Sequence, residues 1–146
     1  MLTPVAPQTS RDDPLSDRQY VSLAQFRYAL RLFLRFSEQA ARGVGLTPSQ
    51  HQLLLAVRGW SDQAGPSVGD LAERLQASPN ATLELVRRVE QEGLIEVGPD
   101  PSDRRRQIVE LTASGSVCLD SLTALHREEL RRFRREMKAL LDDVDR

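Results

Sequence analysis

The chain has 146 residues, of which 40% are hydrophobic and 28% charged, and its formal net charge at pH 7 is −1. This length and composition indicate one globular domain with a real core, and the near-neutral charge argues against a protein that coats nucleic acid over its whole surface. No apolar run reaches the roughly 18 residues of a membrane span. The first residues lack the pattern of a secretory signal, and the single Cys118 excludes an internal disulfide, so we expect a cytoplasmic protein.

The N-terminal part of the chain is predicted to be a tail followed by a long helix. Residues 1–14 include three prolines and several Thr, Ser and Asp residues, so we expect them to be disordered. A helix is predicted from about residue 16 to residue 41. Its apolar side chains cover more than half of its surface: Tyr20, Leu23, Phe26, Leu30, Phe33, Leu34 and Phe36. A helix of this kind is buried on more than one side, which predicts a subunit interface.

Arginines recur every four residues on this helix, at Arg27, Arg31 and Arg35, and form one stripe. One interpretation is a functional surface, either a pocket for an anionic or phenolic ligand or a contact between subunits. The other is a solvated face on which Glu38 is an ion-pair partner, because runs of charge usually face water. The sequence leaves both interpretations open.

A second helix is predicted from residue 47 to residue 60, after a break at residues 42–46. The run Thr47-Pro48-Ser49-Gln50 has the pattern of a capping box with proline in the first turn. His51 lies near its start, where a packed or exposed histidine is the simpler interpretation and a ligand contact is the alternative. Trp60 at its end is expected to pack in the core. No Cys, His or carboxylate has the spacing of a metal site, so no metal is expected.

Two short helices follow at close spacing, over residues 68–75 and 79–92. Ser67 and Asp70 suit the start of the first helix, and Ser78-Pro79 suits the start of the second, with serine as N-cap and proline in the first turn. Gly93 can end the second helix, because glycine adopts a left-handed backbone without steric cost. A helix, a tight turn and a helix predict a helix-turn-helix.

A β-hairpin is predicted next. Residues 94–97 are apolar enough for one strand, and residues 107–111 alternate in polarity as a half-buried returning strand does. Between them, residues 98–102 read Gly-Pro-Asp-Pro-Ser, which predicts a turn. Four charged residues in a row, Asp103-Arg104-Arg105-Arg106, lie at the tip or its shoulder. Arginines there can reach DNA phosphates or a narrow minor groove.

After the hairpin, Thr112 can cap a long helix that starts near Ala113. Apolar residues keep helical spacing to residue 144, and neither proline nor glycine interrupts residues 116–146. The sequence does not decide whether this segment bends near residues 131–135. Cys118 lies on the apolar stripe, so it is expected to be a buried, unreactive thiol and not a redox sensor.

These elements together predict a winged helix-turn-helix, which places its second helix in the major groove of DNA. The residues of that helix that face outwards or sideways are the candidates for DNA contact: Ser78, Asn80, Ala81, Leu83, Glu84, Arg87 and Arg88. Asn80 can read adenine, and arginines can bind guanine edges or phosphates. Glu84 can accept a hydrogen bond from cytosine, or it can form an ion pair with Arg88 one turn away.

Several segments, in this order, resemble the MarR family of bacterial regulators: LAERL-x-x-S, EQEGLIE, DPSDRRR and LTASG. The likeness covers residue 46 to about residue 115. In that family the DP-x-DRR segment is the wing, and L-T-x-x-G opens the next helix. The family usually has an aspartate where this chain has Arg87, and that aspartate anchors a wing arginine. The resemblance therefore implies that the wing is held differently here.

The resemblance implies a mainly helical fold with a small β-wing, in the order four helices, two strands and two helices. It implies a single domain over residues 15–146, with a DNA-binding lobe at about 47–112 between dimerisation helices at about 16–41 and 113–146. The implied function is a homodimeric repressor in the bacterial cytoplasm, which binds a palindromic operator and is released by a small aromatic or phenolic ligand. By position alone, the ligand candidates are Tyr20, Arg27, Tyr28, Arg31, His51 and Trp60. No cofactor is expected.

Two other classes of function are alternatives to a DNA-binding regulator. A winged-helix module that binds proteins and has lost sequence-specific DNA binding would fit the acidic balance, Glu84 and the missing aspartate at position 87. An enzyme is not expected, because the chain has no Ser/His/Asp order, no glycine-rich phosphate loop and no carboxylate pair in an apolar setting.

Overall fold

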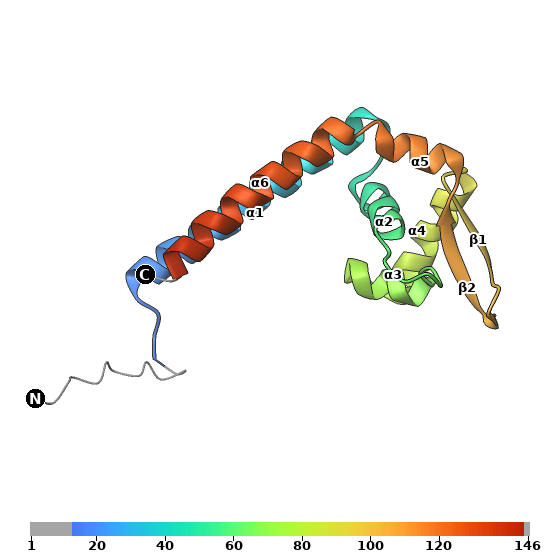
Figure 1. Ribbon diagram of the computed structural model, residues 1–146, viewed down its shortest axis with the longest axis horizontal. Coiled ribbons are helices and arrows are strands. Elements are labelled where there is room, and N and C mark those ends of the chain that lie inside the picture. Colours follow the sequence, from blue (N-terminus) through green and yellow to red (C-terminus); the bar gives the residue numbers. More distant parts are fainter. Residues whose placement is uncertain (1–12, 145–146) are drawn as a thin grey trace, which may run out of the picture.

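Two long helices run side by side away from a smaller lobe of short helices and a β-hairpin (Figure 1). The computed structural model describes residues 13–144, with side chains described to residue 142. The predicted tail at residues 1–14 therefore lies almost wholly outside the described residues. The elements are α1 (Asp17–Gly43), α2 (Pro48–Arg58), α3 (Val68–Leu75), α4 (Pro79–Gln91), β1 (Ile95–Asp100), β2 (Asp103–Leu111), α5 (Ala113–Asp120) and α6 (Thr123–Val144). The predicted fold class, mainly helical with a two-stranded wing, is confirmed.

The helices of the lobe start where the sequence places their caps. The side chains of Thr47 and Ser67 each accept a hydrogen bond from the backbone N–H three residues on. In turn, the side chains of Gln50 and Asp70 accept a bond from the backbone N–H of the cap residue. Such capping boxes satisfy donors that a helix start otherwise leaves free. α3 ends at Gln76, whose left-handed backbone (φ 51°) turns the chain sharply. This turn brings the start of α4 against α3.

The wing is longer than the sequence predicts, and the turn assigned to residues 98–102 is confined to Pro101 and Ser102. β1 continues through Pro99, which pairs with Gln107, and only two residues connect Asp100 to Asp103. Proline is tolerated because each strand of a two-stranded ribbon has one free edge, where a missing N–H costs no ladder bond. The Asp100 carboxylate then closes the turn, since it accepts bonds from the backbone and hydroxyl of Ser102 at 2.9 and 2.7 Å.

The C-terminal segment is two helices, as the resemblance implies, and not the one long helix that the apolar spacing after Ala113 suggests. The break lies at residues 121–122, between α5 and α6, and α6 continues without interruption through residues 131–135. α5 packs against the start of the wing at Gly115. A Cβ atom there would lie 2.0 Å from the carbonyl oxygen of Leu94, so only glycine allows this approach.

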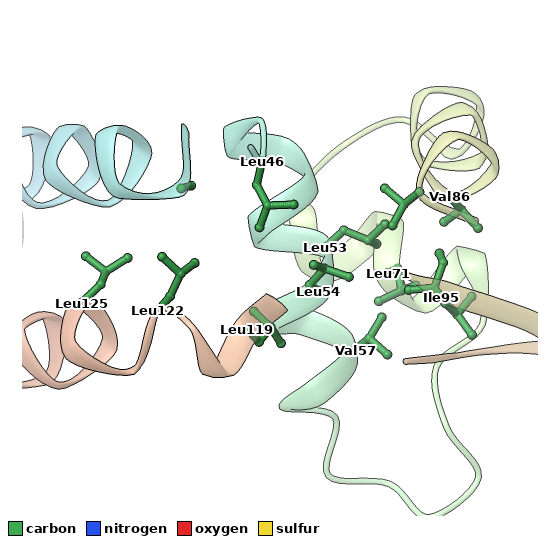
Figure 2. Close-up of a cluster of buried hydrophobic side chains, with 13 residues drawn as sticks. Leu46, Leu53, Leu54, Val57, Leu71, Val86, Ile95, Leu119, Leu122 and Leu125 are labelled. Atoms are coloured by element: carbon green, nitrogen blue, oxygen red, sulfur yellow. The ribbon is translucent and has the colours of Figure 1, made fainter. Parts of the chain in front are cut away.

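One apolar core extends from the lobe into the base of the two long helices (Figure 2). Leu53 and Leu54 of α2 lie at its centre and are fully buried, with Leu71, Val86 and Ile95 around them. Leu119, Leu122 and Leu125 carry the core past α5 to α6. Farther along the two long helices the packing is thinner, and within the described part of α1 only Ala41 is buried.

Two kinds of feature are absent from the described residues. None of the helices there has the length and apolarity needed to cross a membrane. Within residues 13–144 there is also no group of three or more His, Cys, Asp or Glu side chains arranged to hold a metal ion.

Candidate nucleic-acid interface

α4 presents one face to the core and the opposite face to solvent. Thr82, Val86 and Val89 are buried. The predicted DNA-contact residues lie on the other side and are exposed, except for the half-buried Leu83: Ser78, Asn80, Ala81, Glu84, Arg87 and Arg88. The division follows from helical periodicity, since residues 82, 86 and 89 fall on one stripe. α4 can therefore enter a major groove without disturbing its own packing.

Ser78 has a structural task as well as an exposed position. Its hydroxyl accepts a hydrogen bond from the Ala81 backbone at 3.1 Å, and its carbonyl accepts one from the Thr82 hydroxyl at 2.9 Å. Both bonds fix the first turn of α4. The N–H groups of this turn and the side chain of Asn80 thus start from a defined geometry.

Glu84 and Arg88 do not form the ion pair that was one of the two interpretations of Glu84. In the part of the chain that the structure describes, neither side chain takes part in a salt bridge. Both line an open groove of about 450 Å³ between α4 and the start of α2, together with Thr47, Ser49 and Gln52. The carboxylate and the guanidinium remain available to an external partner.

The tip of the wing carries two unpaired cations. Arg104 and Arg105 are exposed, and within the described residues neither has an ion-pair partner. Asp103 shapes the strand start, because its carboxylate accepts a hydrogen bond from the Arg105 backbone at 3.0 Å. The guanidinium groups of Arg104 and Arg105 can therefore follow a DNA backbone or enter a minor groove.

Arg106, which the sequence grouped with the DNA-contacting arginines, is half-buried and bonded within the protein instead. Its guanidinium donates to the carboxylate of Asp70 at 2.5 Å and to the carbonyl of Gly65 at 3.0 Å, and it lies 3.5 Å from the carboxylate of Asp100. One side chain thus ties the wing to the loop before α3 and to the first turn of α3. The family aspartate that anchors a wing arginine is replaced by Arg87 in this chain, and Asp70 of α3 anchors the wing instead.

The two carboxylates at Arg106 are stabilised in their charged form. The pKa of Asp70 is lowered, first by the hydrogen bond from the Ser67 backbone and then by the Arg106 guanidinium. The pKa of Asp100 is lowered mainly by the two bonds from Ser102. Both therefore remain ionised at neutral pH and keep the anchor intact.

Further hydrogen bonds fix α4 relative to its neighbours. Glu90 accepts from the backbone of Val97 in β1 at 2.9 Å. The side-chain amide of Gln50, on α2, donates to both carboxylate oxygens of Glu92 at 3.1 Å. These bonds connect α4 to both β1 of the wing and α2.

The six ligand candidates do not come together in one chain. Tyr20, Arg27, Tyr28 and Arg31 lie along α1 and are exposed. Tyr28 borders an apolar groove of about 650 Å³ between α1 and α6, whereas Arg31 borders a separate shallow hollow on α1. Trp60 lies under Arg74, whose guanidinium is 4.9 Å from the centre of the indole ring. The arginine stripe has no ion pair with Glu38 among the described residues.

His51 is sealed in the core, and its partner was missed by the sequence analysis. It is 2% exposed, and its Nε2 lies 3.1 Å from the Nε2 of His126 on α6. The two residues are 75 positions apart, so no local pattern could connect them. The only available signal was that the chain has two histidines and that each lies on a predicted helix.

Cys118 is half-buried on α5. Burial raises the pKa of its thiol, so less of the reactive thiolate forms at neutral pH. This environment agrees with the expectation of an unreactive cysteine.

Comparisons of the sequence with known proteins agree with this geometry. A family model described as the MarR family matches residues 44–106. The transcriptional activatory protein BadR of Rhodopseudomonas palustris is 35% identical over 102 residues, which are 63% of this chain and 58% of BadR. The HTH-type transcriptional repressor NicR of Pseudomonas putida is 33% identical over 125 residues, which are 82% of this chain and 77% of NicR. The chain thus spans less than two thirds of BadR but more than two thirds of NicR.

Solved structures share the fold. Staphylococcus aureus MepR in its DNA-binding conformation is 25% identical, with a TM-score of 0.68 over 86% of this chain and 95% of MepR. CouR from Rhodococcus jostii RHA1, bound to p-coumaroyl-CoA, is 20% identical, with a TM-score of 0.69 over 88% of this chain and 95% of CouR. At that identity CouR shows the fold alone. The chain belongs to the MarR family of winged helix-turn-helix DNA-binding regulators of transcription, a family of regulators and not of enzymes.

Proposed function

We propose that this protein is a homodimeric repressor that binds an imperfect palindrome with two copies of α4. The observation that carries the proposal is the exposed outer face of α4 together with the exposed arginines of the wing that have no ion-pair partner among the described residues. In a two-fold dimer the two recognition helices would occupy successive major grooves, about 34 Å apart. Transcription takes place where the bacterial chromosome lies, so the proposal places the protein in the cytoplasm.

Each part of this surface suits a different part of the duplex. Asn80 can form a bidentate pair with adenine, and Glu84 can accept from the amino group of cytosine. Arg87 and Arg88 can bind guanine edges or phosphates. Arg104 and Arg105 would reach the flanking minor groove or backbone. Arg106 is left out of the proposed contacts, because Asp70, Asp100 and Gly65 already occupy its donors.

The apolar surface of the two long helices supports a dimer. Large apolar side chains on α1 and α6 are more than 40% exposed in the single chain: Tyr20, Val21, Leu23, Tyr28, Leu30, Leu32, Leu34, Leu130, Phe133 and Leu141. Contiguous apolar surface of this extent marks an interaction site on a soluble chain. A second copy offers the same surface and would cover it isologously.

We further propose that a small aromatic acid, or its thioester, releases the protein from DNA. CouR, which shares the fold, is bound to p-coumaroyl-CoA. The anionic part of such a ligand suits the exposed cations that border the hollow on α1, namely Arg31, Arg35 and Arg42. The two long helices α1 and α6 together form an arm that leads away from the lobe. In this proposal the aromatic part lies between the arm and the lobe, and the partner subunit completes the site.

The experiment that tests the proposal selects bound duplexes from a random DNA library and then measures the affinity at two salt concentrations. Enrichment of a two-fold repeat with half-sites about one turn apart would support it. Absence of enrichment, with only weak binding, would contradict it and favour a protein-interaction module. Addition of aromatic acids and their thioesters to the bound complex then tests the effector.

The wing arginines provide the sharpest single variant. Arg105→Ala is expected to weaken binding to all sequences alike and to lower the salt slope by about one unit, because one phosphate contact is lost. Arg134→Ala on α6 is the matched control, since this arginine is exposed and lies outside the proposed DNA surface. A salt slope for Arg105→Ala equal to that of the control would contradict the proposed wing contact.

A further inference from the structure

We propose that the His51–His126 pair is a proton-sensitive joint between the DNA-binding lobe and the two long helices, so that acidification weakens DNA binding. The inference rests on the proposed function, because DNA affinity is its output. The ligand in this case is the proton.

The pair is a close, nearly coplanar contact. The two Nε2 atoms are 3.1 Å apart, the ring centres are 5.4 Å apart, and the ring planes differ by 12°. A separation of 3.1 Å between two nitrogens is that of a hydrogen bond. One Nε2 must therefore carry a hydrogen while the other presents its lone pair.

The pair connects the two main parts of the molecule. His51 lies on α2, at the centre of the lobe, and His126 lies near the start of α6, in the arm. Among residues 13–142, this is the side-chain hydrogen bond that joins the lobe to α6. The neighbouring joints at the base of the arm are apolar contacts of Leu119, Leu122 and Leu125, which do not respond to pH.

Proton count decides whether the contact survives. With no added proton, or with one, a hydrogen can lie between the two nitrogens. With a second proton, both Nε2 atoms carry hydrogens, and two N–H donors and two positive charges face each other. The rings must then separate, and His51 must reach water because an unpaired buried charge is costly.

The charged surroundings of His51 come from α6. The pKa of His51 is lowered from its ordinary value of 6.5, first by burial and then by the nearby His126. Glu129 acts in the opposite direction, because its carboxylate favours a positive charge on His51. One carboxylate oxygen of Glu129 is buried and has no hydrogen-bond partner among the described residues. On α2 itself, the neighbouring Gln50 donates to the carboxylate of Glu92 at the end of α4.

The sign of the effect follows from these observations. Because His51 binds a proton less readily in the closed structure than in water, acid below about pH 6.5 favours any form in which the ring is released. Release frees the lobe to turn relative to the arm, and the spacing of the two recognition helices depends on that angle. Acid should thus weaken binding, although added positive charge alone would strengthen attraction to DNA.

The test compares DNA affinity at pH 7.5 and pH 5.5 at constant ionic strength. The wild-type dissociation constant is expected to rise by about tenfold, within the usual range of coupling between sites. His126→Gln is expected to bind as wild type does at pH 7.5 and to change by less than about twofold at pH 5.5. The amide of this variant can accept as well as donate, so its contact with His51 survives protonation.

Two outcomes would overturn the proposal: an affinity that is unchanged or higher at pH 5.5, or a variant that loses affinity as much as wild type does. A measurement without DNA separates this proposal from the proposed function. Both histidines of the chain are in the pair, so an NMR titration of the ring protons tests it directly, and the His51 ring is expected to titrate below the ordinary histidine pKa. Two independent titrations near pH 6.5 would refute the joint even if DNA binding is confirmed, or if His126→Gln fails to fold.

Discussion

Two parts of this protein differ in how far they bury their apolar side chains: the lobe (residues 44–112) and the arm (helices α1 and α6). In the lobe, Leu53, Leu54 and Leu71 are fully buried within a single chain. In the arm, Leu130 is 69% exposed and Phe133 is 59% exposed. The lobe therefore completes its own core, whereas the arm leaves apolar surface that only another molecule can cover. The proposed DNA surface and the proposed subunit interface therefore lie on separate parts of the chain.

The largest effect is expected from a charge on the uncovered face of the arm. Phe133→Asp should raise the dissociation constant of the proposed dimer by about a thousandfold or more, because each dimer would bury two unpaired carboxylates. Analytical ultracentrifugation measures this change. The lobe should stay folded, as judged by the near-UV signal of Trp60.

Ala139→Asp is the control for this variant. Residue 139 is exposed on the same helix and lies about half a turn around from Leu130, so the same charge is added away from the apolar stripe. A dimer that tolerates Phe133→Asp as well as it tolerates Ala139→Asp would place the subunit interface elsewhere.

The lobe is expected to respond to the loss of its own packing. Leu53→Ala should lower the free energy of unfolding by about 3 kcal/mol, which is the usual cost of a cavity at a fully buried leucine. Leu55→Ala, on the same helix but 37% exposed, should cost less than about 1 kcal/mol. Urea unfolding at a fixed protein concentration measures both. Equal losses would mean that the core is not centred on α2.

A smaller effect should come from the anchor of the wing. Asp70→Asn removes a negative charge near the DNA surface, which by electrostatics alone would strengthen binding. Because Asp70 holds Arg106, and Arg106 holds the wing, we expect DNA affinity to fall by about fivefold instead, a modest loss since the pair is partly exposed. Titration of labelled operator measures it.

Glu73→Gln is the matched control, because it removes a charge from the same helix at an exposed position without touching the anchor. Its affinity should be unchanged or slightly higher. If Asp70→Asn behaves as Glu73→Gln does, the wing does not depend on this contact.

Much of the fold was accessible from local sequence patterns. The caps at Thr47, Ser67 and Ser78 and the apolar stripe of α4 predicted the start and orientation of three helices. Each of these features depends on residues within about one or two turns, so the sequence contains all that is needed. The exposed candidates on α4 were predicted for the same reason.

The errors have a common origin in contacts that local patterns do not describe. Pro99 suggested a turn, but the pairing with β2 keeps residues 98–100 in the strand. No proline or glycine marks the break between α5 and α6 in the sequence. Arg106 looked like its neighbours Arg104 and Arg105, and only the arrangement in space distinguishes them.

The sequence by itself determined the class of fold, the order of its elements and the face of α4 that stays exposed, because periodicity and capping act over a few residues. Only the tertiary structure decided which charged and titratable groups meet. Arg106 finds Asp70 at a separation of 36 residues, and His51 finds His126 at a separation of 75. Such partners are selected by how helices and strands pack, and packing depends on the whole chain at once.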